Sequence, residues 1–95
     1  MDARTTYLLA PHVLAQFDLD EAVLLDELRG SYFSANPVAS LILRQCRESV
    51  GRDALLMAML EQFRIDAVRA AADLDRFLDD AVRHGVLHRS ESGRA

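Results

Sequence analysis

The stretch AVLLDELRGSYFSANP, residues 22–37, decides the fold that this sequence predicts. Gly30, a residue that can take a positive φ, is preceded by aliphatic residues and followed by the Tyr32-Phe33 pair. This pattern predicts a β-hairpin. Pro37 lacks an N–H for a ladder hydrogen bond and suits the first turn of a helix, so the second strand of the hairpin is short and a helix follows it.

An earlier strand is predicted in HVLAQFDLD, residues 12–20, where apolar and polar residues alternate. Val13, Ala15, Phe17 and Leu19 fall on one side of it. With the hairpin, it makes a meander of three short antiparallel strands. If the third strand is the last of its sheet, its outer edge has unpaired N–H and C=O groups, which can serve as a docking site.

Three helices are predicted after the meander. The first begins at Pro37, Gly51 marks the break before the second at about 53–63, and the third lies between an Asp66 N-cap and a Gly85 stop. The fold class is therefore α+β, in the order βββααα, similar to a winged-helix domain with its sheet moved to the front. We expect an N-terminal arm at 1–11, one domain at 12–87 and a disordered polar tail at 88–95.

The third helix carries a wide apolar arc. Its members follow helical spacing and span roughly 140° in projection, more than the ~100° that a core-facing stripe needs. One flank can therefore line a groove. We favour the Phe77 side, where Asp73, Asp80 and His84 are neighbours in projection, although the alternative that the whole arc is core remains open. The arc consists of Leu74, Phe77, Leu78, Ala81 and Val82.

Composition and charge narrow the classes of partner that this protein can have. The chain has 95 residues and a net charge of −4, with eleven basic residues that are all arginine and interleaved with acids. This distribution argues against a nucleic-acid partner, as does the excess of Asp over Arg on the third helix. No signal peptide and no apolar run long enough to cross a bilayer are present, so we expect a cytoplasmic protein without a membrane partner.

Catalytic and cofactor motifs are absent from the sequence. Cys46 lies in an apolar helical pattern, and the histidines lack the paired spacing of a metal site, so we expect no enzyme activity, metal or cofactor. An acyl carrier would need a serine at a helix start in an Asp-Ser-Leu setting, which the chain lacks.

At this point the chain resembles the PqqD-like family, the small leader-peptide recognition domains of ribosomally made, modified peptide pathways. The likeness covers roughly residues 12–87 and rests on VLLDELRGSYFSANP, on the helix from Pro37 and on the segment from Asp73 to the Gly85-Val86-Leu87 end. The LAPHV segment at 9–13 is more similar to the standalone recognition proteins of lasso-peptide clusters. Ala35 departs from the family pattern, which usually has Leu before the Asn.

The resemblance implies a non-catalytic protein that captures the leader region of a precursor peptide as an added strand and presents it to a leader peptidase resembling cysteine proteases, and to a cyclase. Two alternatives remain: a partner of a radical-SAM peptide-modifying pathway, and a winged-helix DNA-binding regulator. We place the apolar pockets for leader side chains between the third strand and the third helix, with Asp73 and Arg76 adding charge register. The predicted peptide-binding residues are Ser31, Tyr32, Phe33, Ser34, Asp73, Leu74, Arg76, Phe77 and Ala81.

Overall fold

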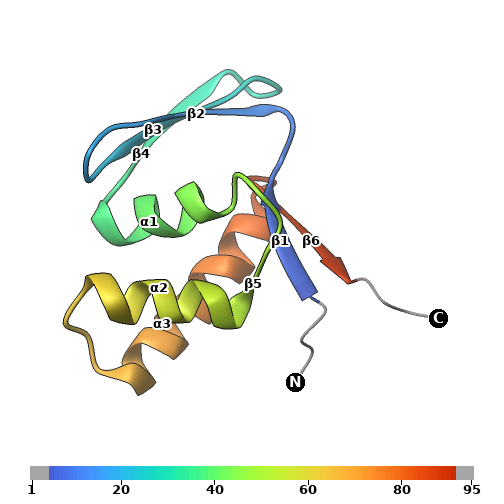
Figure 1. Cartoon of the computed structure of the whole chain (residues 1–95). Helices are drawn as coiled ribbons and strands as arrows, with labels where there is room; N and C mark the ends of the chain where they lie inside the picture. Colours follow the sequence, from blue (N-terminus) through green and yellow to red (C-terminus); the bar gives the residue numbers. More distant parts are fainter. Residues whose placement is uncertain (1–4, 92–95) are drawn as a thin grey trace.

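The computed structural model describes residues 5–91 and places them in two small antiparallel sheets and three helices (Figure 1). Residues 1–4 and 92–95 lie outside the described part of the chain. Along the chain the elements are β1 (Thr5–Leu9), β2 (Val13–Phe17), β3 (Ala22–Asp26), β4 (Ser31–Ala35), α1 (Pro37–Gln45), β5 (Val50–Gly51), α2 (Arg52–Gln62), α3 (Ala67–Arg83) and β6 (Leu87–Glu91).

The predicted meander is present as the sheet β2-β3-β4, and the α+β class is confirmed. Gly30 has a φ of +69° in the β3–β4 turn, where its N–H donates to the Asp26 carbonyl at 2.7 Å. Register pairs Leu24 with Phe33 and Asp26 with Ser31. The turn residue that the sequence singled out therefore closes this hairpin, because glycine takes a positive φ at little steric cost.

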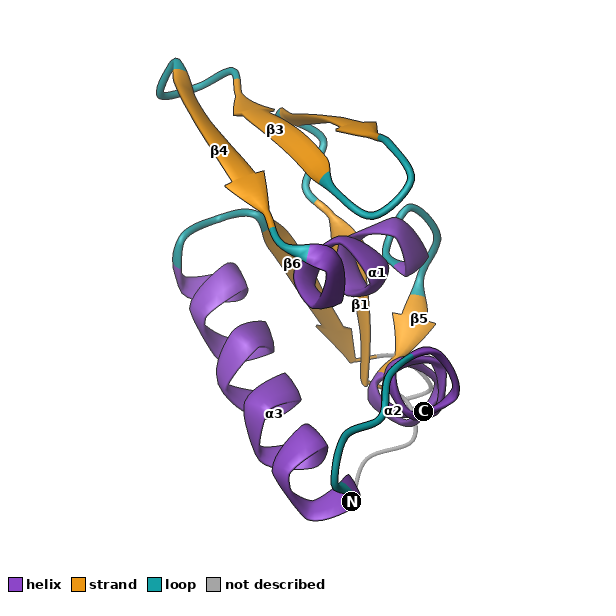
Figure 2. Ribbon diagram, turned by 90° about the vertical axis from the view of Figure 1, so that its left-hand side faces the viewer, coloured by secondary structure: helices purple, strands orange, loops and turns teal. Residues whose placement is uncertain are grey.

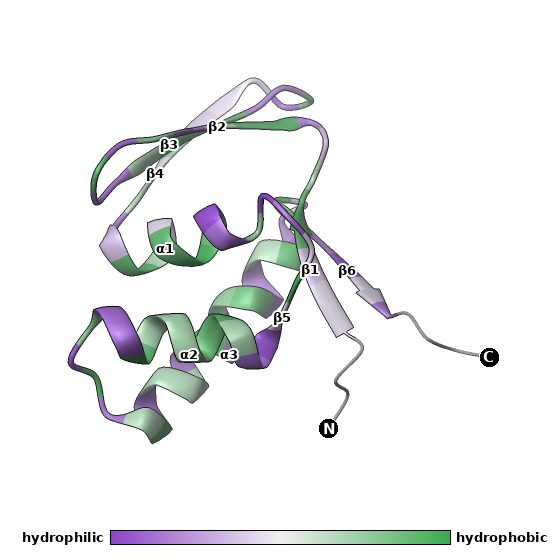
Figure 3. Cartoon of the chain, in the orientation of Figure 1, coloured by the Kyte–Doolittle hydropathy of each residue, from purple (hydrophilic) through white to green (hydrophobic). Residues whose placement is uncertain are grey.

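One face of the meander covers α1, and the other is open to solvent. Val13 and Leu24 are buried on the inner face, whereas Leu14 and Val23 are half exposed on the outer face. Leu19, which we expected to continue the apolar side of the first strand, lies beyond β2 and is 92% exposed. In Figure 3, β2 and β3 are largely green, as expected for strands that contribute apolar side chains to the core, whereas β4 is paler.

A second sheet, in the order β5-β1-β6, was not predicted. β1 pairs with β6 over its full length, from Thr5 opposite Glu91 to Leu9 opposite Leu87. The expected N-terminal arm is therefore a strand over residues 5–9, and the expected disorder from residue 88 is wrong for residues 88–91. The rest of that expected tail, residues 92–95, lies outside the described residues.

The helices begin and end close to where their capping residues predict. The Asp66 carboxylate accepts a hydrogen bond from the Arg69 N–H at 3.0 Å, and Gly85, at φ +78°, follows the end of α3. Asn36 caps α1 in the same way, through the Ala39 N–H at 2.8 Å. Among the described residues, no helix has both the length and the apolar character needed to span a bilayer.

The core lies between the inner face of the meander, the three helices and β1. Its largest members are almost completely removed from solvent, and Val86 and Leu87 fold back onto it as expected. The meander, α1 and α3 all contribute side chains to this core, so its packing positions them relative to one another. Its largest buried side chains are Leu24, Ile42, Leu55, Met59, Leu74 and Leu78.

Candidate functional site: a pocket beneath an open strand edge

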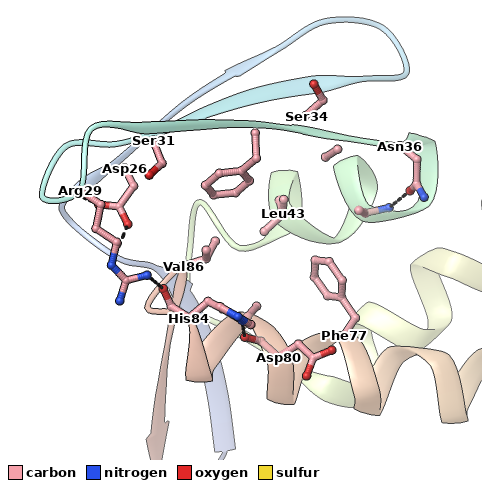
Figure 4. A pocket seen from close by; sticks show the side chains of 14 residues that line it. Asp26, Arg29, Ser31, Ser34, Asn36, Leu43, Phe77, Asp80, His84 and Val86 are labelled. Carbon is pink, nitrogen blue, oxygen red and sulfur yellow. Dashed lines mark hydrogen bonds and ion pairs between the residues drawn. The ribbon is translucent and has the colours of Figure 1, made fainter.

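A pocket of about 540 Å³ lies beneath β4, between α1 and the C-terminal half of α3. Figure 4 shows the side chains that line it, with Phe77 reaching from α3 toward α1 and Leu43 on the α1 side of the pocket. Most of the wall is apolar. Three polar lining residues, Asp26, Arg29 and His84, lie near one end, whereas Asn36 lies at the opposite end in Figure 4. The lining residues are Asp26, Arg29, Ser31, Phe33, Ser34, Ala35, Asn36, Ala39, Leu43, Phe77, Asp80, Ala81, His84 and Val86.

The strand above the pocket has an open edge. In the order β2-β3-β4, β4 pairs with no strand but β3 within residues 5–91, and Figure 2 shows it at the side of the meander that overhangs α3. The N-terminal segment does not occupy this edge within the described residues, because β1 pairs instead with β5 and β6. The backbone groups on the outer side of β4 therefore have no strand partner in the described residues, and of these residues only Ala35 has its carbonyl bound by a side chain, the Ser40 hydroxyl at 3.0 Å.

Alternation along β4 separates the two aromatic residues. Phe33 shares the inner face with Ser31 and Ala35 and lines the pocket, whereas Tyr32 points outward and is 72% exposed. The sequence required that the two face opposite ways but could not say which faces inward. Ser34 lies at the rim of the pocket, and its side chain points away from it in Figure 4.

Helix α3 forms the opposite wall, and it does so with the flank that its apolar arc predicted. Phe77 is half-buried and Ala81 is buried, and both line the pocket. Leu74 is fully buried and belongs to the core, one turn before Phe77 on the same helix. The 3.6-residue period cannot separate these two roles, because both residues lie on the same apolar arc.

The predicted charged residues on α3 lie outside the pocket. Asp73 forms ion pairs with Arg76 at 3.5 Å and with Arg69 at 3.8 Å, on the outer surface of the helix. Surface pairs of this kind contribute little to stability. Of the nine predicted residues, the structure brings five to the pocket and leaves Tyr32, Asp73, Leu74 and Arg76 elsewhere.

The polar end of the pocket was missed by sequence reasoning. Arg29, from the β3–β4 turn, donates a hydrogen bond from Nη1 to the His84 carbonyl at 3.2 Å, and its Nε lies 4.0 Å from Asp26 Oδ2 (Figure 4). His84 is the C-cap residue of α3, where a cation is favoured by the helix dipole. The sequence contained one weak indication of this polar end, because Asp80 and His84 lie next to Phe77 in helical projection.

Metal-binding side chains and the single thiol were the candidates for reactive groups in the described residues. They contain no cluster of three or more His, Cys, Asp or Glu side chains that could hold a metal ion. Cys46 is buried, and loss of hydration raises the pKa of its thiol to about 12, so the thiolate is scarce at neutral pH. The geometry suits capture of an extended chain: an open strand edge supplies backbone partners, and the pocket accepts side chains.

Comparison with known proteins places the chain in a family. A search of curated proteins gives no match. Among solved structures, the fold is similar to that of TbiB1 in complex with the TbiA(beta) leader peptide, with a TM-score of 0.77 and 25% identity, over 93% of this chain and 98% of that one. The family model described as coenzyme PQQ synthesis protein D (PqqD) matches residues 21–87. The chain therefore belongs to the PqqD family.

Proposed function

We propose that this protein binds the leader region of a ribosomally synthesised precursor peptide and presents it to a modifying enzyme, without catalysing a reaction itself. The observation that carries the proposal is the open edge of β4 along a pocket of about 540 Å³. The similarity to TbiB1, whose structure holds a leader peptide, supports the proposal that this protein binds a leader peptide. The peptide would pair with Ser31–Ala35 as an antiparallel fourth strand of the meander.

Energetics explain why both the edge and the pocket are needed. Three or four backbone hydrogen bonds, at a net of about 0.5–1.5 kcal/mol each, roughly cancel the ~2–5 kcal/mol cost of ordering a flexible peptide. Binding near 1 μM requires about −8 kcal/mol. Two or three apolar peptide side chains, each contributing about 1.5–3 kcal/mol on burial, supply the difference. The walls formed by Phe33, Phe77 and Leu43 offer that burial.

The enzyme served is proposed to be a lasso-peptide leader peptidase, with a cyclase as a second partner. The similarity of the LAPHV segment at residues 9–13 to the lasso branch supports this choice. Holding the leader on a separate protein raises its local concentration near the enzyme, as a tethered module does. A radical-SAM pathway is the alternative, and the neighbouring reading frames distinguish the two: a short precursor beside a peptidase supports the first, and one beside a radical enzyme supports the second.

Phe77→Arg tests the groove. Peptides selected from a random display library on the immobilised wild-type chain are labelled with fluorescein, and their affinities are measured by fluorescence polarisation. Phe77→Arg places a guanidinium in the apolar pocket, so we expect at least about a hundredfold loss, because an anchor side chain loses its site and a charge is partly buried. The far-UV circular dichroism spectrum should be unchanged.

Val68→Arg is the matched control, because Val68 lies on the same helix, is 79% exposed and does not line the pocket. It should bind as the wild type does. Hydrogen exchange adds a direct readout of strand addition, since amides of β4 should exchange more slowly when peptide is bound. Failure to select any peptide with a Kd near 1 μM, or equal binding by the Phe77→Arg variant, would contradict the proposal.

A further inference from the structure

Asp26 stands out at the polar end of the pocket, because it is a carboxylate that is only 3% exposed. It is the last residue of β3, opposite Ser31 on β4. One oxygen, Oδ1, accepts hydrogen bonds from the backbone N–H groups of Leu28 at 3.0 Å and Arg29 at 3.2 Å. These two bonds shape the β3–β4 turn and satisfy one of the two carboxylate oxygens.

The other oxygen, Oδ2, accepts no hydrogen bond from the described residues, and its nearest cation is Arg29 Nε at 4.0 Å. Within the same part of the chain, no side-chain polar atom is both sealed from solvent and without a partner. Oδ2 is therefore not completely sealed from solvent, and Asp26 is one of the residues that line the pocket. A carboxylate oxygen that loses water on ligand binding needs a new donor, because leaving it unpaired costs free energy.

The surrounding charges limit which donor fits. A cationic side chain would approach the Arg29 guanidinium, which the His84 carbonyl holds in place at 3.2 Å. An anionic side chain would meet both Asp26 and Asp80. A neutral donor avoids both conflicts. Hydroxyl and carboxamide groups are the neutral donors that peptide side chains most often offer.

We infer that Asp26 is a specificity-determining residue, whose Oδ2 accepts a hydrogen bond from a hydroxyl or carboxamide side chain of the bound peptide. The inference rests on the proposed function and specifies what the peptide must contain. A strand antiparallel to β4 runs from Ala35 toward Ser31, so this side chain lies in the C-terminal part of the bound segment. Side chains on one face of a strand recur every second residue. The hydrogen-bonding residue of the peptide therefore lies two residues after the peptide residue opposite Phe33.

A double-mutant cycle tests this subsite. The probe is a peptide selected from the random display library on the wild-type chain, paired with a copy in which the hydroxyl or carboxamide residue is replaced by its nearest apolar isostere, such as Thr by Val, Tyr by Phe or Gln by Met. Wild-type protein should bind the copy at least about tenfold more weakly, because a hydrogen bond to a charged acceptor is lost. The Asp26→Asn variant should distinguish the two peptides by less than about threefold.

Asp26→Asn suits the cycle because its amide oxygen can still accept the two backbone hydrogen bonds of the turn, while an amide N–H₂ replaces the Oδ2 acceptor. A purely structural role for Asp26 would lower affinity for both peptides equally and leave the discrimination intact. Asp20→Asn, at an exposed loop acid that does not line the pocket, is the matched control and should keep the wild-type discrimination.

The outcomes separate this inference from the proposed function. Selected peptides without a neutral donor at the expected position, or equal discrimination by wild type and Asp26→Asn, would overturn the Asp26 subsite while leaving peptide binding intact. Absence of any binding peptide would overturn both. Should Asp26→Asn fail to fold, the peptide pair on wild-type protein still decides, since equal affinity for both copies contradicts the inference.

Discussion

Residues of similar chemistry that lie close together in the sequence have different roles in this protein. Phe33 lines the pocket and Tyr32 points to solvent, because successive side chains of a strand face opposite ways. Leu74 is core and Phe77 is pocket wall, one helical turn apart on α3. A side chain's place in the function therefore depends on which neighbour covers it, and only the packing determines that.

At the residue scale, Cys46 predicts a pH dependence of stability. Burial raises the pKa of its thiol from about 9 to about 12, so between these values the unfolded chain loses a proton that the folded chain keeps. The unfolded state then binds fewer protons, and stability falls as the pH rises through this window. The free energy of unfolding, measured by urea titration at pH 8 and pH 10, should decline by up to about 1.4 kcal/mol per pH unit from this group.

Cys46→Ala is the control for this measurement. It is expected to be less stable at both pH values, because a buried side chain is shortened, but to lack the thiol's part of the decline. The difference between the two pH slopes isolates Cys46 from the tyrosines and arginines that also titrate at high pH. Parallel slopes for the two proteins would show that the thiol is not desolvated.

Among the elements, α3 matters most for the site, because it supplies one wall of the pocket and ends at the polar corner. Its start depends on the Asp66 cap, which accepts the Arg69 N–H. Asp66→Ala should lower the free energy of unfolding by about 1 kcal/mol, since an N-terminal N–H loses its partner. Denaturant titration measures the change.

Asp66→Asn keeps a side-chain oxygen at the cap and loses only the charge, so it should retain most of the stability that Asp66→Ala loses. Because Asp66 does not line the pocket, peptide affinity of both folded variants should match the wild type. An alanine variant as stable as wild type would mean that the cap contributes nothing in this context.

At the scale of the whole molecule, the second sheet joins the two ends of the chain. Arg89 on β6 hydrogen-bonds to the Tyr7 hydroxyl at 3.2 Å, lies over its ring and pairs with Asp79 on α3. Truncation after Leu87 removes these contacts and most of the β1–β6 ladder. At a net of about 0.5–1.5 kcal/mol for each lost hydrogen bond, the free energy of unfolding should fall by about 2 kcal/mol or more.

A chain ending at Glu91 is the control for this truncation, because it keeps all the described residues of β6. Its thermal midpoint should stay close to that of the full chain, while the chain ending at Leu87 should unfold at a clearly lower temperature. Equal midpoints for the two truncated chains would mean that β6 adds no stability.

The sequence by itself determined the features that depend on neighbouring residues. Gly30 closes the hairpin because its positive φ is a local requirement, and Asp66 and Gly85 bound α3 because caps act within one turn. The meander followed from alternation, and the wide arc on α3 indicated which flank, that of Phe77, would line a groove.

Tertiary structure alone decided the features that join distant segments. The β1–β6 pairing connects the two ends of the chain, and β6 after Leu87 exposes every residue, so no apolar pattern marked it as a strand. The polar corner of the pocket forms where Arg29 meets the carbonyl of His84, 55 residues later in the chain. Local propensity cannot predict such long-range contacts, because they form only when the core packs the meander against the end of α3.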